Sequence, residues 1–277
     1  MALISLPLRR RLLRLRRGLA RFLIRPLLLS RRRARLVYRA GAALRAWDAY
    51  HPLPWLGIGR GSRTGGTLER WALMQPLIDK ITPGSAIDLG AQVGYFTFQL
   101  AERGWLVLGV ESDPYTHAGA CLIRRSVRLN RAAFECMKIT SSSIRSLPSV
   151  DIFIFLSLWH HLCLAEGLES ARGILCDVLE RTRLVCFFES GQADEAYEGW
   201  VDRWPDMSPD PRQWLKKMLL ECGAVHVDYL GSTPTHLGPV PRHLFAAWTR
   251  EPGDPVSNED VKRCRDYIPL ARKSLSR

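Results

Sequence analysis

From Ser85 onward, short apolar runs alternate with longer segments in which apolar residues recur at helical spacing. The short runs predict about seven strands, near 85–90, 106–111, 133–138, 151–157, 183–189, 225–230 and 243–249. The longer segments predict helices near 66–81, 94–103, 115–129, 164–181 and 211–221. This alternation predicts an α/β fold: a doubly wound, mostly parallel sheet covered by helices on both faces.

The final two predicted strands differ from the others in their connection. They are separated by "GSTPTHLGPVP", a stretch rich in turn residues and without helical periodicity. Parallel neighbours need a long crossover, whereas antiparallel neighbours need only a loop. We therefore predict that the last two strands form an antiparallel hairpin at the sheet edge.

Charge divides the chain into an arm and a domain. The formal net charge is +13, but the first 47 residues hold fourteen Arg and no Lys, Asp or Glu, which leaves the remainder close to neutral. We assign residues 1–47 to a basic arm, 48–250 to one α/β domain and 251–277 to a polar tail. The excess charge is therefore no evidence for a basic active-site cleft.

The arm contains no apolar run long enough to cross a bilayer. Its Leu and Arg residues recur at spacings that favour a basic amphipathic helix on an anionic membrane surface. An RNA-binding arm, an organelle presequence and an extension without function share this composition, so these interpretations stay open, with nucleic acid as second choice of partner. We predict a cytoplasmic protein, peripheral to the membrane if the arm binds lipid.

Cysteine usage bears on compartment and on metals. The seven Cys include no C-x-x-C pair and mostly lie in apolar segments. This pattern is typical of a reducing compartment and argues against both a zinc site and a disulfide framework. We expect no metal.

The stretch "AIDLGAQVGYF" (86–96) carries the first functional signal. Asp88, Gly90 and Gly94 follow the first predicted strand at its carboxyl end, where doubly wound sheets bind ligands. A dinucleotide fingerprint would require glycine where Gln92 and Tyr95 stand, so NAD is disfavoured.

The D-x-G-x-x-x-G pattern, followed by Glu111 at the end of the next predicted strand, resembles motif I and its successor in class I S-adenosylmethionine-dependent methyltransferases. The resemblance covers roughly residues 66–249 and departs from the commonest form at Gln92. It implies that Asp88 and the turn of Gly90, Gln92 and Gly94 form the site for the methionine part of the cofactor. It also implies that Glu111 accepts hydrogen bonds from the ribose hydroxyls, a task that suits an ionised carboxylate.

Three further residues are candidates for cofactor contacts under this resemblance. Tyr95 either packs on the cofactor or belongs to the core. Thr140 is a polar candidate near the adenine, because "KITSSSIRSLP" lacks the acidic residue that the family often has there. Ser157 ends the fourth predicted strand, where these enzymes place residues that face the reacting methyl group.

The fourth predicted strand also indicates which acceptors to exclude. "DIFIFLSLWHHL" has neither the Asn/Asp-Pro-Pro-aromatic run of exocyclic-amine methyltransferases nor a Pro-Cys pair, so methylation of nucleobases by either route is disfavoured.

The S-x-x-H-H run at the end of this strand resembles the corresponding sequence of methyltransferases that act on hydroxyls or phosphate ends. His160 or His161 is a candidate general base for a hydroxyl, because neutral imidazole predominates at pH 7; either could instead pack on or cap a helix. A phosphate oxygen would need no base.

Several residues are candidates for contacts with the acceptor. Glu189 ends the fifth predicted strand and either positions the acceptor or a histidine, or is a solvated strand-end charge, the simpler interpretation. A long acidic connection follows, in which Trp200 and Trp204 either stack on a sugar ring or belong to the core. Upstream, Arg60, Arg63 and Arg70 are candidates to hold the cofactor carboxylate or an anionic acceptor, or are ordinary surface arginines.

Together these features predict an enzyme that transfers a methyl group from S-adenosylmethionine to an oxygen, with a saccharide, a lipid-linked intermediate or another small hydroxyl compound as acceptor. Two alternatives remain: an RNA methyltransferase whose arm binds phosphates, and an inactive cofactor-binding scaffold at a membrane.

Overall fold

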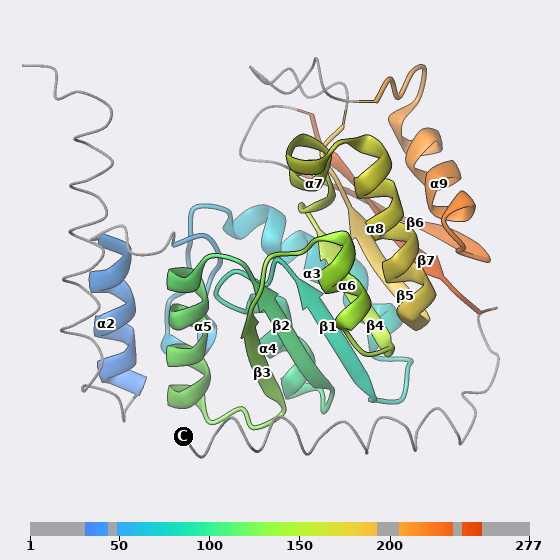
Figure 1. Cartoon of the computed structure of the whole chain (residues 1–277). Coiled ribbons are helices and arrows are strands. Elements are labelled where there is room, and N and C mark those ends of the chain that lie inside the picture. Colours follow the sequence, from blue (N-terminus) through green and yellow to red (C-terminus); the bar gives the residue numbers. More distant parts are fainter. Residues whose placement is uncertain (1–30, 44–48, 193–204, 235–239, 251–277) are drawn as a thin grey trace, which may run out of the picture.

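A computed structural model describes residues 31–43, 49–192, 205–234 and 240–250 of the 277-residue chain. Its centre is a seven-stranded sheet with strand order β3-β2-β1-β4-β5-β7-β6 (Figure 1). The strands are β1 (Ser85–Leu89), β2 (Leu106–Glu111), β3 (Ala132–Cys136), β4 (Val150–Leu156), β5 (Thr182–Glu189), β6 (His226–Thr233) and β7 (Arg242–Trp248). β1 to β5 are parallel, and β7 is antiparallel to both of its neighbours.

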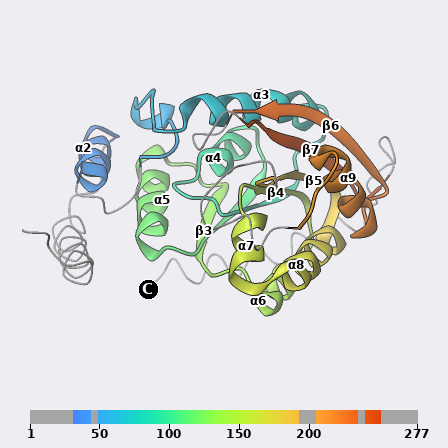
Figure 2. The ribbon, with the colours of Figure 1, turned by 90° about the horizontal axis from the view of Figure 1, so that it is seen from above.

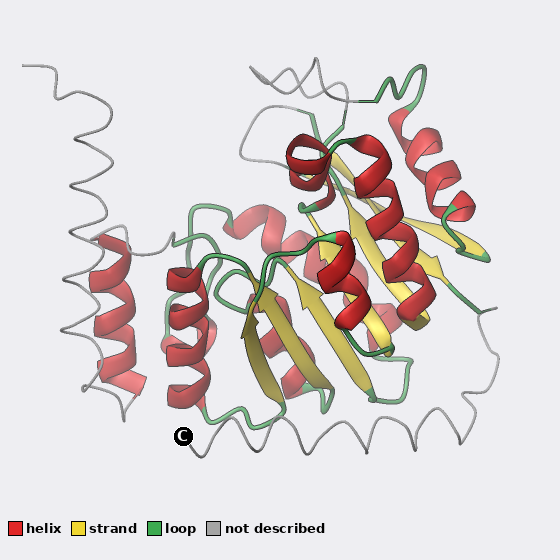
Figure 3. Ribbon diagram, viewed as in Figure 1, coloured by secondary structure: helices red, strands yellow, loops and turns green. Residues whose placement is uncertain are grey.

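Helices cover both faces of this sheet, as Figures 2 and 3 show. One face packs against α3 (Thr64–Ile78), α4 (Tyr95–Glu102) and α5 (Pro114–Val127). The other packs against α6 (Ser141–Ser146), α7 (Trp159–Glu166), α8 (Leu168–Arg181) and α9 (Pro211–Glu221). At the β3 end of the sheet, α2 (Arg31–Ala43) contacts α5 and the short 3-10 helix η1 (Pro54–Leu56).

The run "VDIFIFL" of β4 is apolar because both of its faces are covered. Ile152 and Ile154 pack into the core beneath α3 and α4, whereas Phe153 and Phe155 pack into the opposite core. Successive strand residues point to opposite faces, so a central strand between two helical layers has no solvent-facing position. Each half of the molecule thus has its own apolar core, and the sheet separates the two.

The predicted α/β architecture is confirmed, including all seven strands and the antiparallel pair at the edge. The single helix predicted at 164–181 is wrong. Gly167, with φ 85°, divides that region into α7 and α8, and α7 begins five residues earlier than expected, at Trp159. α6 was not predicted; Thr140 caps it through a reciprocal pair of hydrogen bonds with Ser143.

The arm is helical where the structure describes it, in α2. The other residues of segment 1–47 and the tail at 251–277 lie outside the described residues. Within the described ranges, no helix is both long and apolar enough to cross a membrane.

Candidate functional site

A tight loop after β1 forms the first part of the site. Gly90, Gln92 and Gly94 all have left-handed backbone conformations, with φ of 71°, 53° and 92°. At Gly94 a Cβ would also lie 2.5 Å from the ring of Phe134, so this position excludes any side chain. The loop is held against β2 because the N–H groups of Gly90 and of the next residue both donate to the Val110 carbonyl at 2.9 Å.

Glu111 lies beside this loop at the end of β2. Its Oε2 accepts from the Gln92 N–H at 3.0 Å, and its Oε1 accepts from the Asp113 N–H at 2.8 Å. An ionised carboxylate offers about four acceptor positions, so these bonds orient Glu111 and leave capacity for the hydroxyls of a ligand. The residues predicted to hold the methionine part and the ribose of the cofactor therefore meet in one place.

Asp88 lies beneath the loop and is almost fully buried. Its Oδ2 accepts from the Thr97 N–H at 3.0 Å and from the Thr97 hydroxyl at 2.7 Å. Burial raises the pKa of Asp88 to about 7, the Thr97 hydrogen bonds oppose that rise, and the charge of Glu111 adds to it. In this structure Asp88 ties β1 to α4 and supports the loop from behind.

Two other residues that were candidates for cofactor contacts, Tyr95 and Thr140, make contacts within the protein itself. Tyr95 is buried at 2% exposure and packs against the rings of His51, Trp55 and Phe96, as the core interpretation expects. The Thr140 hydroxyl accepts from the N–H of residue 143 at 3.2 Å as the N-cap of α6.

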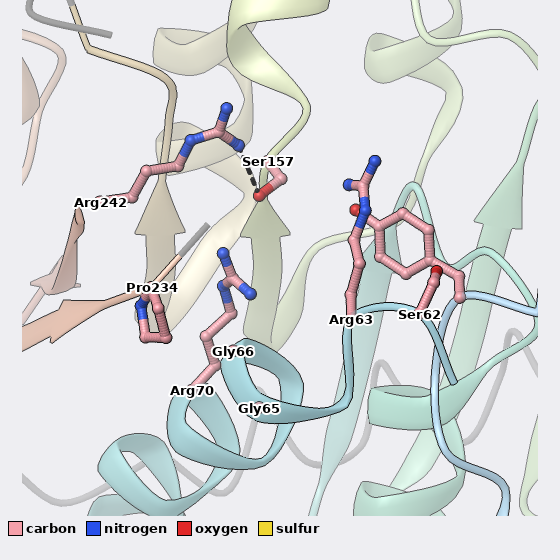
Figure 4. A pocket seen from close by; sticks show the side chains of 9 residues that line it. Ser62, Arg63, Gly65, Gly66, Arg70, Ser157, Pro234 and Arg242 are labelled. Carbon is pink, nitrogen blue, oxygen red and sulfur yellow. Dashed lines mark hydrogen bonds between the residues drawn. The ribbon is translucent and has the colours of Figure 1, made fainter. Parts of the chain in front are cut away.

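A pocket of about 210 Å³ opens where β4 ends (Figure 4). Its lining comes from segments far apart in the chain: Tyr50, Ser62, Arg63, Gly65, Gly66, Arg70, Ser157, Pro234 and Arg242. Gly66 allows the start of α3 to approach the end of β6, because a Cβ there would lie 2.6 Å from the Pro234 carbonyl oxygen. Figure 4 shows Arg63 and Arg242 on opposite sides of Ser157, with Arg70 between them.

Glu189 lies behind this pocket and is fully buried, so its interpretation as a solvated strand-end charge was wrong. It forms a two-pronged ion pair with Arg70 and accepts from the hydroxyls of Ser157 at 2.7 Å and Thr233 at 3.0 Å. Burial by itself would raise the pKa of Glu189, but the charges of Arg70 and Arg242 and these bonds outweigh it and hold that pKa below its usual value.

Three arginines determine the charge of the pocket. The described lining holds Arg63, Arg70 and Arg242 and no acidic residue, and Glu189 behind the pocket forms an ion pair with Arg70. The Arg63 guanidinium lies 3.7 Å above the Tyr50 ring, and Arg242 donates to the Ser157 hydroxyl at 3.1 Å. Sequence reasoning had named Arg63 and Arg70. It missed Arg242, because an arginine at the start of a hairpin strand carries no local signal.

The two candidate histidines lie in the first turn of α7 and occupy different environments. His160 is buried, and its Nδ1 accepts from the Gly191 N–H at 3.1 Å, so the neutral ring carries its proton on Nε2. The side chain of His161 reaches solvent. Burial lowers the pKa of both residues, and the positive charge of Arg242 lowers each further. Both rings are therefore neutral at pH 7.

Other sequence candidates are not part of the described site. Trp200 and Trp204 lie outside the described residues. Within the part of the chain that the structure describes, no group of three His, Cys, Asp or Glu side chains is arranged to hold a metal ion.

Comparison with known proteins identifies the fold. No family model matches the sequence. Over 165 residues the chain is 25% identical to WbdD of Escherichia coli, an O-antigen chain terminator bifunctional methyltransferase/kinase; the match covers 59% of this chain and 22% of WbdD. A crystal structure of WbdD superposes with a TM-score of 0.58 at 22% identity, covering 73% of this chain and 45% of that one. The chain has the class I S-adenosylmethionine-dependent methyltransferase fold.

A second structure shares this class I methyltransferase fold over nearly its whole length. The N-terminal domain of EvdMO1, crystallised in the presence of S-adenosylhomocysteine and D-fucose, superposes with a TM-score of 0.54 at 15% identity, covering 81% of this chain and 99% of that domain. The chain spans about a fifth of the length of WbdD in the sequence match.

Proposed function

We propose that this protein transfers a methyl group from S-adenosylmethionine to an oxygen of a saccharide acceptor that carries an anionic group. The observation that carries this proposal is the arginine-lined pocket at the end of β4, beside the glycine loop. A Cβ at Gly90 would lie 3.5 Å from Leu158, the residue after Ser157, so the loop and the pocket are close neighbours.

The chain's own residues fit the cofactor. The left-handed loop of Gly90, Gln92 and Gly94 would hold the methionine part, and Glu111 would accept from the ribose hydroxyls. When bound, S-adenosylmethionine supplies an electrophilic methyl group on a sulfonium sulfur and leaves as a neutral thioether. The N-terminal domain of EvdMO1, which shares the fold, was crystallised in the presence of S-adenosylhomocysteine, and this supports the assignment.

The composition of the pocket supports an anionic acceptor. The described lining contains three arginines and no acidic residue, and the guanidiniums of Arg63 and Arg242, on opposite sides of Ser157, would meet one anionic group from two sides. Arginine presents N–H groups in a planar fork that matches phosphate and carboxylate oxygens, so a saccharide phosphate or a uronic acid fits. The names of the relatives, an O-antigen chain terminator and an enzyme crystallised with D-fucose, support a sugar acceptor.

His161 is the group that we assign to proton removal when the acceptor is a hydroxyl. The Nε2 of His160 is a donor in the neutral ring, whereas His161 is solvent-accessible, neutral at pH 7 and within the electrostatic influence of Arg63 and Arg242. The imidazole of His161 would take the proton that the acceptor hydroxyl loses on methylation. Alignment of the acceptor with the methyl group by the arginines would supply a further part of the rate enhancement.

The proposal is tested in two stages. Calorimetry with S-adenosylmethionine and S-adenosylhomocysteine should give binding that Glu111→Ala weakens; absence of binding by the folded protein would overturn the proposal. Labelled S-adenosylmethionine is then offered with matched sugars that bear a phosphate, a carboxylate or neither. We expect transfer to an anionic sugar, with a raised KM in Arg242→Gln. Equal transfer to the neutral sugar would contradict the assigned role of the pocket.

A further inference from the structure

Helix α2 has two faces of different character. Ala34, Val37, Tyr38 and Gly41 are buried, and the helix contacts α5 and η1. At 3.6 residues per turn, Arg32, Leu36, Arg39 and Ala43 lie on the opposite side, and all four are exposed. We call Arg32, Leu36 and Arg39 the outer face of α2.

This outer face combines positive charge with an exposed apolar side chain. α2 contains five arginines and no acidic residue, and neighbouring α5 contains two arginines and no acidic residue. On the α5 side, Arg125 and Arg128 are exposed as well. Leu36 is 66% exposed, more than any other large hydrophobic side chain in the described part of the chain. The side chain of Leu36 therefore contributes little to the packing of α2 against the domain.

We propose that the outer face of α2 binds the surface of a bilayer that contains anionic phospholipid. Guanidinium groups are attracted to the negative headgroups, and a leucine between them can enter the boundary with the acyl chains. A nucleic-acid backbone would also attract the arginines, but it gives no apolar region for Leu36. The exposed leucine therefore favours lipid over RNA.

The place of α2 in the fold suits such a contact. Figure 2 shows α2 beyond α5, at the β3 end of the sheet. The arginine pocket lies between α3, the end of β4 and the start of β7, well inside the strand order. A membrane that contacts α2 would leave the pocket accessible. Lipid binding is also independent of methyl transfer, so each can fail without the other.

The test uses the full chain and sedimentation with vesicles. Vesicles of phosphatidylcholine alone are compared with vesicles of equal parts phosphatidylcholine and phosphatidylglycerol. We expect binding only to the anionic vesicles. The double variant Arg32→Gln, Arg39→Gln should bind about 25-fold more weakly, because each basic residue at an anionic surface contributes about fivefold. Leu36→Gln should bind about fivefold more weakly, since it removes the apolar contact.

A matched control distinguishes the effect of the outer face of α2 from the effect of total charge on vesicle binding. Lys80, which follows α3, and Lys217 on α9 are both exposed and lie away from α2. Lys80→Gln, Lys217→Gln removes the same charge and should bind vesicles like wild type. Wild-type affinity in the double arginine variant would overturn the proposal, as would equal losses in both double variants. Duplex RNA binding that needs Arg32 and Arg39 but not Leu36, without vesicle binding, would overturn it in favour of nucleic acid.

Discussion

The charge of a carboxylate in this protein depends on its nearest neighbours. Asp88 and Glu189 both lie at the carboxyl end of a central strand, and both are buried. Thr97 is the hydrogen-bonding partner of Asp88, and burial raises the pKa of Asp88 to about 7. Glu189 faces Arg70, whose charge and hydrogen bonds hold its pKa below the usual value despite burial. Carboxylates in the same topological position thus have pKa values shifted in opposite directions by their neighbours.

The ion pair of Glu189 with Arg70 gives a stability prediction. Glu189→Ala would leave Arg70 buried without its carboxylate, and breaking a buried pair from one side typically costs about 3–5 kcal/mol. Urea unfolding should show a loss of this size. The control is Glu221→Ala, which breaks the exposed pair with Arg172 and should cost less than about 1 kcal/mol. Similar losses in the two variants would contradict the structural role of Glu189.

Replacing Asp88 or Glu111 by its neutral amide should change the affinity for S-adenosylmethionine by different amounts. Asp88→Asn should leave the affinity for S-adenosylmethionine within about threefold, whereas Glu111→Gln should weaken it by about tenfold, a loss of about 1.4 kcal/mol. The raised pKa of Asp88 means that wild-type stability falls as pH rises from 3.8 to about 7, since the unfolded state ionises first. Asn cannot ionise, so calorimetric unfolding of the Asn variant should lack this decline. A large loss of cofactor affinity in Asp88→Asn would instead indicate direct contact.

His161 provides a test of the hydroxyl acceptor. His161→Ala should lower kcat by about 10²-fold or more, the usual size of a general-base contribution, with KM little changed. A base must be neutral, and the pKa of His161 is below 6.5, so wild-type kcat/KM should be flat above pH 7 and fall only below 6.5. Retention of kcat by His161→Ala would mean that the acceptor oxygen is already anionic.

At the scale of elements, single glycines determine where helices begin and end. Gly167 separates α7 from α8, which periodicity alone could not detect because both helices are apolar toward the same core. Gly94 starts α4 with a left-handed conformation that also brings the helix against Phe134. The glycine loop and the first turn of α4 are therefore one unit.

Substitution of these glycines should have unequal effects. Gly94→Ala combines a φ of 92° with a Cβ 2.5 Å from Phe134, so we expect destabilisation by about 2 kcal/mol or more in thermal unfolding. Gly173 in α8 has no atom within 4 Å of its Cβ position. Gly173→Ala should therefore be neutral or stabilising by up to about 1 kcal/mol. Equal effects would indicate that the loop tolerates a side chain.

At the scale of the molecule, buried ionisable groups couple stability to pH in opposite directions. His51 is buried and pairs through Nδ1 with the Thr67 hydroxyl at 2.8 Å. Burial and the charge of Arg70 lower the pKa of His51 to about 3. Below pH 6.5 the unfolded chain binds a proton at this site that the folded chain does not, so folding stability is lost as pH falls from 6.5 to about 3. Asp88 acts in the opposite sense.

Because these effects oppose each other, the measurement compares wild type with His51→Gln, which retains hydrogen-bonding capacity. Between pH 7 and pH 4, wild type should lose about 3 kcal/mol more unfolding free energy than the variant, at about 1.4 kcal/mol per pKa unit. Identical pH profiles for the two proteins would mean that His51 is protonated in the folded state.

The sequence by itself determined the seven strands along the chain, most of the helices between them, the antiparallel edge pair, and the meeting of the glycine loop with Glu111. These features depend on local periodicity, and residues at the ends of neighbouring parallel strands are brought together by the topology alone. Only the tertiary structure decided the arginine-lined pocket at the end of β4. Arg70 reaches Glu189 across 119 residues of sequence, and Arg242 reaches Ser157 across 85. Such partners are selected by how α3 and the β6–β7 hairpin pack on the sheet, which no local pattern of residues specifies.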